Sequence, residues 1–322
     1  MSHLRSYRNA GLIPRASGAA VAALKTRAAA WDLDLIETPD ALSMVIWGCE
    51  LRLIPESDAV RLELSAPEMR LMGNLQDSAT EIFAEAGLEV QWERVNTGAL
   101  APGLAVMRVV SVRQVTPGFT RVRLQGPEAA RFGRDSLHFR LLLPQPGRRP
   151  VWPRIGETGR TIWPEGPDAL HRPVYTVIAQ QDDWLDFDIY QHKGSPTCDW
   201  ALSAPEGQEV AIVGPGGGWC PEADRLVLFG DETALPAIAR MLDLARGEVS
   251  AIIRADLHDL GALAADPRVR RADDLLAALA DADIGGAYVW FASHAEEARQ
   301  ARGHLLSRGL TKKEFMAAAY WG

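Results

Sequence analysis

The sequence LVLFGDETALP at residues 226–236 predicts an apolar strand that runs into Gly230 and then into a helix. An apolar run of this length bounded by glycine is typical of a buried strand in a parallel sheet. A helix that begins near Thr233 or Ala234 presents unpaired N–H groups at the carboxyl end of that strand, which favours an anion there. Asp231 and Thr233 are also ordinary helix caps, and the run lacks the G-x-G-x-x-G spacing, so a structural turn explains the pattern equally well.

The residues that follow continue the alternation of strand and helix. The expected strands are residues 226–229, 249–253 and 287–292, and the expected helices are residues 235–244, 273–279 and 295–307. Alternation of this kind predicts a parallel sheet with helices on both faces. Residues 223–322 are therefore predicted to form a nucleotide-binding α/β domain.

The residues that precede the run have a different texture, in which β-rich segments are separated by proline and glycine. The expected strands are residues 106–115, 120–124, 139–143, 174–178, 185–190 and 210–213. Six such strands predict an antiparallel barrel over residues 104–222. Residues 144–167 are rich in Pro, Gly, Trp and Arg, and we expect them to form a long loop over that barrel.

The first part of the chain predicts a small α+β module at residues 1–97. Residues 19–31 and 69–86 have helical patterns, and apolar alternation at residues 42–46 and 60–64 predicts half-buried strands. Small and turn-forming residues at 96–103 are typical of a linker. The module contains no recognisable catalytic constellation. The fold class is thus multidomain: an α+β module, an antiparallel barrel and a parallel-sheet α/β domain.

Composition excludes several classes of partner and site. The formal charge of −8 over 322 residues argues against nucleic acid or an anionic membrane as partner, and no window predicts a signal peptide or a membrane span. Cys49, Cys198 and Cys220 lie far apart and form no C-x-x-C pair. Together with the scattered histidines they predict a reducing, cytoplasmic setting and no metal bound by the protein.

The run FGDETALPAIAR at residues 229–240 closely resembles the start of the nicotinamide-binding half of siderophore-interacting flavoproteins, which are relatives of ferredoxin reductases. Weaker matches occur elsewhere in the chain, in the order along the sequence that this family requires. They are Thr116-Pro117, Leu141 to Pro144, Tyr175 to Val177, His192 through Trp200-Ala201, Gly214 to Gly217, and the terminal Tyr320-Trp321-Gly322. The resemblance covers residues 104–322. It implies that the barrel binds FAD and that the α/β domain binds NADPH or NADH.

The resemblance assigns roles at the end of one barrel strand. It implies that the ring of Tyr175 packs on the isoalloxazine, that the hydroxyl of Thr176 lies near flavin N5, and that an arginine neutralises the FAD pyrophosphate. Arg172 stands one residue earlier than the family pattern, and Pro173 occupies the expected place. An ordinary Tyr-Thr pair in an edge strand is the alternative.

Two further groups of residues are implied at the cofactor sites. His192, Gly194, Ser195 and Thr197 would surround the FAD pyrophosphate, although they also fit a simple helix cap. The run from Gly230 through Asp231, Glu232 and Thr233 to Ala234 would face the nicotinamide nucleotide.

The residues after the second strand of the α/β domain bear on the choice of nucleotide. Arg254 would favour the 2′-phosphate of NADPH, whereas Asp256 would favour the 2′-hydroxyl of NADH.

The activity implied is transfer of electrons from NAD(P)H through FAD to ferric iron in a siderophore or other chelate, with release of ferrous iron. Such chemistry needs no general acid or base, which agrees with the lack of a catalytic triad in the sequence. Two alternatives stay open. One is a general flavin or ferredoxin-type reductase, and the other is a siderophore-binding protein that has lost FAD.

Overall fold

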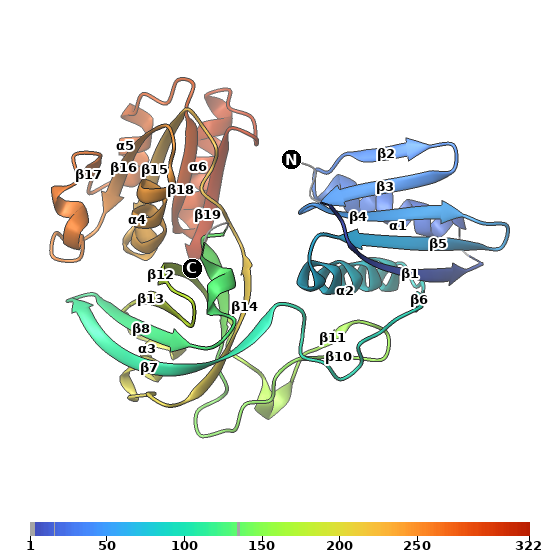
Figure 1. The fold of residues 1–322 in the computed structure, drawn as a ribbon. Coiled ribbons are helices and arrows are strands. Elements are labelled where there is room, and N and C mark those ends of the chain that lie inside the picture. Colours follow the sequence, from blue (N-terminus) through green and yellow to red (C-terminus); the bar gives the residue numbers. More distant parts are fainter. Residues whose placement is uncertain (1–3, 16, 134–135) are drawn as a thin grey trace. The chain divides into compact units, whose positions relative to one another are not determined.

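The computed structural model describes residues 4–15, 17–133 and 136–322. The chain consists of two compact units (Figure 1). The first unit is Met1–Leu104 with Gly147–Leu170, and the second is Ala105–Pro146 with His171–Gly322.

The first unit is built on an antiparallel sheet with the strand order β2-β3-β4-β5-β1-β6. Its elements are β1 (Tyr7–Pro14), α1 (Ser17–Ala30), β2 (Leu35–Thr38), β3 (Ala41–Ile46), β4 (Cys49–Pro55), β5 (Ala59–Ala66), α2 (Met69–Glu85) and β6 (Gln91–Trp92). Alternate side chains such as Leu51 and Leu62 are buried, and apolar residues of α2 such as Phe83 pack into the same core. Period-two burial in the strands and a one-sided helix therefore form the predicted α+β arrangement.

The segment from Gly147 to Leu170 belongs to the first unit, so the expectation of a loop over the barrel is wrong for it. It forms the short strands β10 (Arg154–Ile155) and β11 (Thr161–Ile162). The carboxylate of Asp77 on α2 accepts hydrogen bonds from the backbone N–H of Thr161 at 2.7 Å and from its hydroxyl at 3.1 Å. Composition predicted irregular chain correctly, but it contains no information on which surface satisfies that chain's polar groups.

The second unit begins with a closed antiparallel barrel of the order β12-β13-β8-β7-β14-β9, which confirms the predicted six-stranded barrel. Its strands are β7 (Leu104–Thr116), β8 (Phe119–Gln125), β9 (His138–Leu142), β12 (Val174–Gln180), β13 (Trp184–Tyr190) and β14 (Glu209–Gly216). The barrel also carries the 3-10 helix η1 (Ala129–Phe132) and the short helix α3 (Pro196–Leu202). A further 3-10 helix, η2 (Gly166–Asp168), lies in the first unit. Closure leaves the barrel no open sheet edge.

The α/β domain contains a parallel sheet of the order β17-β16-β15-β18-β19, as predicted. Its elements are β15 (Arg225–Asp231), η3 (Glu232–Ala234), α4 (Leu235–Leu244), β16 (Glu248–Arg254), η4 (Gly261–Ala265), β17 (Val269–Arg271), α5 (Leu275–Asp281), β18 (Tyr288–His294), α6 (Ala295–Ser307) and β19 (Phe315–Trp321). Along β15, Leu228 packs with α4 on one face while Phe229 packs with α5 and α6 on the other. Burial on both faces explains why this strand is continuously apolar.

Two polar contacts join the barrel to the α/β domain within the second unit. Arg240 on α4 donates hydrogen bonds to the carbonyl oxygens of Val177 and Gly133, each at 2.7 Å. The carboxylate of Asp259 accepts from the Thr116 hydroxyl and from the Gly118 N–H, each at 2.7 Å. These contacts fix the carboxyl edge of the parallel sheet against one end of the barrel.

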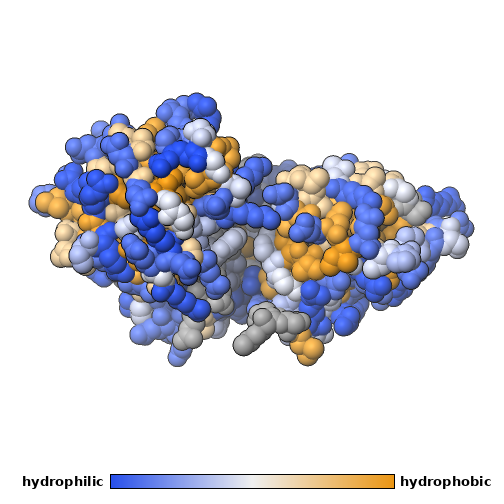
Figure 2. All heavy atoms as spheres, turned by 90° about the horizontal axis from the view of Figure 1, so that it is seen from above, coloured by the Kyte–Doolittle hydropathy of each residue, from blue (hydrophilic) through white to orange (hydrophobic). Residues whose placement is uncertain are grey.

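The surface is mixed in character. Figure 2 shows hydrophilic residues over most of the visible face, with a group of hydrophobic residues on the first unit. Exposed apolar side chains of that unit include Ile36, Trp47 and Met69. Among the described residues, no helix combines the length and hydrophobicity that crossing a membrane requires.

The contact of Arg240 with the barrel predicts a loss of stability on substitution. Arg240→Met should lower the free energy of unfolding by about 3 kcal/mol, because it removes charged donors from buried carbonyl groups. Urea unfolding measures this, with Arg246→Met as the matched control because the exposed Arg246 follows the same helix. A loss no greater than that of the control would contradict the assigned role.

Candidate functional site

Strand β12 positions Tyr175 and Thr176, whose side chains point to opposite faces of the barrel wall because they are neighbours on one strand. Tyr175 is half-buried, and its ring centroid lies 5.0 Å from that of Phe187. Thr176 is buried and pairs across the ladder with His138 on β9. The two residues therefore take part in separate groups of contacts.

Tyr175 belongs to a cluster with Thr197 and His171. Burial raises the pKa of Tyr175, and a hydrogen bond with Thr197 opposes that rise. The buried Thr197 hydroxyl also lies 3.0 Å from Nε2 of His171. Sequence reasoning did not assign His171, whose only signal was its place three residues before the strand.

The loop at residues 192–195 leads into helix α3, whose second residue is Thr197. Ser195 caps this helix, since its hydroxyl accepts from the N–H of Cys198 at 3.3 Å. The hydroxyls of Ser195 and Thr197 thus bind within the chain. His192, Lys193 and Gly194 are exposed, and Gly194 has a φ of 81°, which favours glycine.

Cationic side chains flank the cluster of Tyr175, Thr197 and His171. Arg172 is exposed and directly follows His171, and its carbonyl oxygen accepts a hydrogen bond of 2.8 Å from Arg140. Lys193 lies on the loop that leads into helix α3, which contains Thr197. This edge of the barrel therefore combines an aromatic ring with positive charge, a combination that suits an anionic aromatic ligand.

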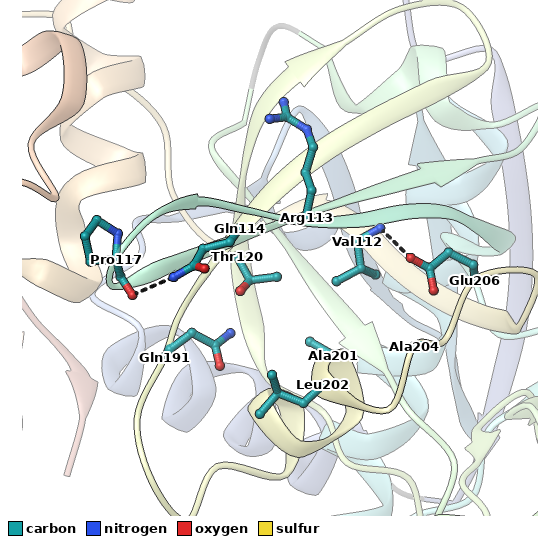
Figure 3. Close-up of a pocket in the computed structure, with 10 residues that line it drawn as sticks. All are labelled: Val112, Arg113, Gln114, Pro117, Thr120, Gln191, Ala201, Leu202, Ala204 and Glu206. Carbon is teal, nitrogen blue, oxygen red and sulfur yellow. Dashed lines mark hydrogen bonds between the residues drawn. The ribbon is translucent and has the colours of Figure 1, made fainter.

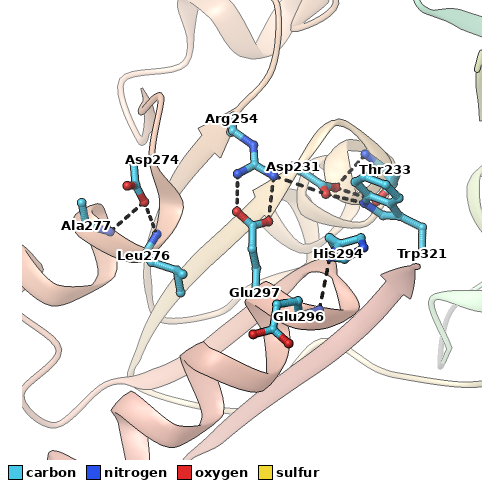
Figure 4. Close-up of polar contacts among 10 residues, drawn as sticks. All are labelled: Asp231, Thr233, Arg254, Asp274, Leu276, Ala277, His294, Glu296, Glu297 and Trp321. Carbon is cyan, nitrogen blue, oxygen red and sulfur yellow. Dashed lines mark hydrogen bonds and ion pairs between the residues drawn. The ribbon is translucent and has the colours of Figure 1, made fainter.

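Asp231, at the carboxyl end of β15, has no exposed surface. Its carboxylate accepts from the Thr233 N–H at 3.0 Å, from the Thr233 hydroxyl at 2.6 Å and from Nε1 of Trp321 at 2.7 Å (Figure 4). Asp231 therefore caps η3 through Thr233 and anchors the last strand through Trp321.

Gly230 and Ala234 are buried packing residues. A Cβ atom at Gly230 would lie 2.5 Å from the Cβ of Ala234 and 2.8 Å from Cδ1 of Ile238. Only glycine allows the strand and helix α4 to approach this closely. Packing thus explains two of the five candidate residues of this turn, Gly230 and Ala234.

Glu232 and Arg254 lie near the same carboxyl edge. Arg254 makes a bidentate contact with Glu297, with 2.8 Å between Nη2 and Oε2, and this hydrogen bonding raises the pKa of Arg254 (Figure 4). Burial is the main cause of the raised pKa of the half-buried Glu232. Asp256 is exposed and caps a turn by accepting from the His258 N–H.

His138 connects the barrel strand β12 to the last strand of the α/β domain. Its Nδ1 lies 3.1 Å from the Thr176 hydroxyl, and its Nε2 lies 3.0 Å from the Tyr320 hydroxyl. Burial, and secondarily the charge of Arg240, lowers the pKa of His138 to about 4. Sequence reasoning missed this residue, because a lone histidine before the apolar run at 139–143 is typical of a satisfied core position.

A separate pocket of about 460 Å³ lies between the β7–β8 hairpin and α3 (Figure 3). Val112, Gln114, Thr120, Gln191 and Leu202 are among its lining residues, and none of the predicted site residues is. The pocket is therefore distinct from the Tyr175 cluster and from the carboxyl edge of the parallel sheet.

An antiparallel barrel followed by a parallel-sheet nucleotide domain defines a ferredoxin-reductase-like protein. The family model described as siderophore-interacting FAD-binding domain matches residues 108–219, and the model described as siderophore-interacting protein matches residues 223–322. The chain belongs to the siderophore-interacting protein family, and its barrel is the FAD-binding domain of that family.

Among proteins with curated names, an NADPH-dependent ferric-chelate reductase of Escherichia coli is 32% identical over 145 residues. That match covers 42% of this chain and 55% of the relative. The ferric vibriobactin reductase ViuB of Vibrio cholerae is 30% identical over 164 residues, which cover 47% of this chain and 58% of the relative. The matched region thus spans little more than half the length of either relative.

Solved structures give a longer overlap. A siderophore utilization protein from T. fusca superposes with a TM-score of 0.58 at 28% identity, over 71% of this chain and 95% of that one. The siderophore-interacting protein SipS from Aeromonas hydrophila, at 24% identity and a TM-score of 0.53, covers 68% of this chain and 91% of its own, and it supports the fold.

The packing at Gly230 predicts that even a methyl group is not tolerated. Gly230→Ala should destabilise the chain by about 2 kcal/mol, because overpacking forces strand β15 and helix α4 apart. Gly303→Ala is the matched control: it lies on α6 with open space around the added Cβ, so it should be neutral or stabilising. Thermal unfolding compares the two variants, and equal effects would contradict the packing role.

The lowered pKa of His138 predicts a dependence of stability on pH. The ordinary pKa of 6.5 holds in the unfolded chain and about 4 in the folded one, so only the unfolded chain takes up a proton between these values. Stability is thus fully present above pH 6.5 and is lost as pH falls, by about 2 kcal/mol at pH 5. Urea unfolding measured from pH 7 to 5 should show that the free energy of unfolding of His138→Gln depends less steeply on pH than that of the wild type. Part of the pH dependence that remains is expected from His171, because burial lowers its pKa as well. An unchanged slope would exclude His138 as a cause.

Proposed function

We propose that the chain is an FAD-dependent reductase that passes electrons from NADPH or NADH to ferric iron in a siderophore or other chelate, releasing ferrous iron. One observation carries this proposal. Two hydrogen bonds through His138 join Thr176, the residue expected beside the flavin, to Tyr320 at the edge of the nucleotide domain. The expected flavin and nicotinamide sites therefore adjoin each other, as electron transfer between them requires.

The donor set at the barrel edge fits FAD. Tyr175 supplies an aromatic surface, Thr176 a hydroxyl, and Arg172 and Lys193 the positive charge for a pyrophosphate. The exposed backbone of Gly194 allows close approach of phosphate oxygens. Because the Ser195 and Thr197 hydroxyls bind within the chain, we assign these two residues to shaping the loop around the cofactor.

When bound, FAD supplies the conversion of a two-electron donor into one-electron steps. The chain's own residues hold and orient it. Tyr175 is supported from behind by Phe187, so its ring is held at a fixed angle. Thr176 is buried and held by His138, so its hydroxyl can orient a neighbouring group without competition from water.

The nicotinamide nucleotide would lie at the carboxyl edge of the parallel sheet, beside η3. Arg254 and Arg271 stand at the ends of the adjacent strands β16 and β17, where a ribose phosphate is expected. Arg271 is exposed and is oriented by the carbonyl oxygen of Ala255 at 3.0 Å. These two cations support NADPH over NADH, as does the name of the Escherichia coli relative.

The acceptor follows from the family and from charge. Ferric siderophores are commonly anionic, and Arg140 and Lys193 are exposed beside the expected flavin site. We propose a cytoplasmic reductase in which the second unit supplies both catalytic domains, the barrel before residue 223 and the α/β domain at residues 223–322, and in which the first unit, including residues 147–170, is an accessory module.

Absorbance tests this function directly. The purified protein incubated with FAD should show a flavin absorbance band at about 450 nm, and NADPH should bleach this band under anaerobic conditions. A ferric chelate should then restore the band, and a dye specific for ferrous iron should trap the product. Tyr175→Ala should weaken FAD retention at least about tenfold, because the isoalloxazine ring of FAD loses the aromatic surface on which it would stack. Trp47→Ala, an exposed site in the first unit, is the control.

Each other outcome selects a rival. A protein that takes up no FAD is a binding protein and not an enzyme. Bleaching by neither nucleotide points to a protein donor, and bleaching that only free flavin or a ferredoxin reverses points to a general reductase.

A further inference from the structure

His138 is the centre of a buried group that draws on three separate strands. Its side chain comes from β9, the Thr176 hydroxyl from β12 and the Tyr320 hydroxyl from β19. Only 5% of His138 is exposed, and its ring meets the Tyr320 ring edge-on at 5.8 Å. Among the residues that the structure describes, each ring nitrogen therefore has one hydroxyl as its partner at hydrogen-bond distance.

A neutral imidazole carries one N–H donor and one acceptor nitrogen, so the two hydroxyls cannot bind it in the same way. If Nδ1 carries the proton, it donates to the Thr176 oxygen, and Tyr320 donates to Nε2. Thr176 then keeps its own O–H available as a donor. If Nε2 carries the proton, it donates to Tyr320, Thr176 donates to Nδ1, and the Thr176 oxygen is left as an acceptor.

We propose that His138 is a positioning residue whose tautomer couples Tyr320 to Thr176 and decides whether Thr176 presents a donor or an acceptor to the cofactor. This proposal rests on the proposed function, because it concerns the FAD site. Oxidised flavin has an acceptor nitrogen at N5, and reduced flavin carries a hydrogen there. A hydroxyl whose polarity can reverse serves both forms, whereas a fixed donor serves only one.

The chemistry of the two hydroxyls sets the expected state without cofactor. A phenol is intrinsically a stronger hydrogen-bond donor than the alcohol of Thr176, and burial, followed by the charge of Asp231, raises the pKa of Tyr320 so that its hydroxyl keeps its proton. Tyr320 therefore donates to Nε2, and His138 carries its proton on Nδ1. Arg240, whose charge disfavours a second proton on this ring, helps to keep it neutral.

Nitrogen NMR of the full chain labelled with ¹⁵N-histidine, without FAD and at pH 7, tests this state. We expect His138 to be neutral and protonated on Nδ1, with assignment by loss of its signals in His138→Gln. Tyr320→Phe should shift the population towards the Nε2-protonated tautomer at least about tenfold, since Nε2 then loses its donor. Tyr288→Phe, a tyrosine of the neighbouring strand β18, is the matched control and should change nothing.

The same spectra distinguish coupling from packing alone. A purely structural contact predicts that Tyr320→Phe leaves the His138 tautomer as it is. That result, or a wild-type His138 protonated on Nε2, overturns the proposal. The tautomer of His138 in the wild type and its change in Tyr320→Phe are both measured without cofactor. These two results therefore test the coupling even if the proposed function is wrong.

The protein loaded with FAD gives the second test. On anaerobic chemical reduction the wild-type His138 should change from the Nδ1 to the Nε2 tautomer, and Thr176→Val should abolish that change while Tyr288→Phe retains it. An identical tautomer in the oxidised and reduced wild-type protein overturns the proposal. A chain that takes up no FAD instead contradicts the proposed function, and the cofactor-free measurement then decides the coupling by itself.

Discussion

The buried carboxylate of Asp231 is the constraint on which the carboxyl edge of the parallel sheet depends. A charge without exposed surface must be compensated by donors, and these come from three segments. Thr233 lies in η3 just before the first α-helix of this domain, Trp321 ends the last strand, and Arg254 approaches to 3.8 Å from the neighbouring strand β16. One side chain thereby fixes the start of a helix and the end of the chain relative to the central strand.

Consequences of this arrangement reach the barrel. Because Trp321 donates a hydrogen bond to Asp231, the preceding Tyr320 points to the barrel, where its hydroxyl lies within hydrogen-bond distance of His138. Arg240 on α4 contacts the same region through backbone carbonyls. The α/β domain is therefore held against the end of β12 by both ends of its fold, its first helix and its last strand. A site made from both domains can keep its geometry under such restraint.

Much of the fold could be predicted from sequence, because it depends on periodicity that each segment carries by itself. Apolar alternation gave the barrel strands, and the change to strand and helix near Leu226 gave the parallel sheet. Strand β19 was missed because its alanines have low strand propensity, and β17 because it spans only Val269–Arg271. Residues 147–170 were misplaced because their partners are on α2, far away in sequence.

Less of the candidate site could be predicted, because its contacts join residues distant in sequence. His138 is 38 residues from Thr176 and 182 from Tyr320, so no local pattern relates them. The resemblance proposed Tyr175 and Thr176 as flavin contacts, which stay predictions, and spacing could not reveal the packing role of Gly230 or the capping role of Ser195.

The run from Gly230 to Ala234 shows why motif and mechanism need separate arguments. Gly230 permits close packing of strand and helix. The carboxylate of Asp231 accepts hydrogen bonds from Thr233 and Trp321 within the chain. The run therefore mainly shapes the carboxyl edge of the sheet, and the charged groups that remain available at this edge belong to side chains that reach solvent. Arg271 meets that condition, and Arg254 does so only to the extent that Glu297 releases it. The positive charge of Arg254 at this edge is thus restrained by an ion pair that lies outside the run itself.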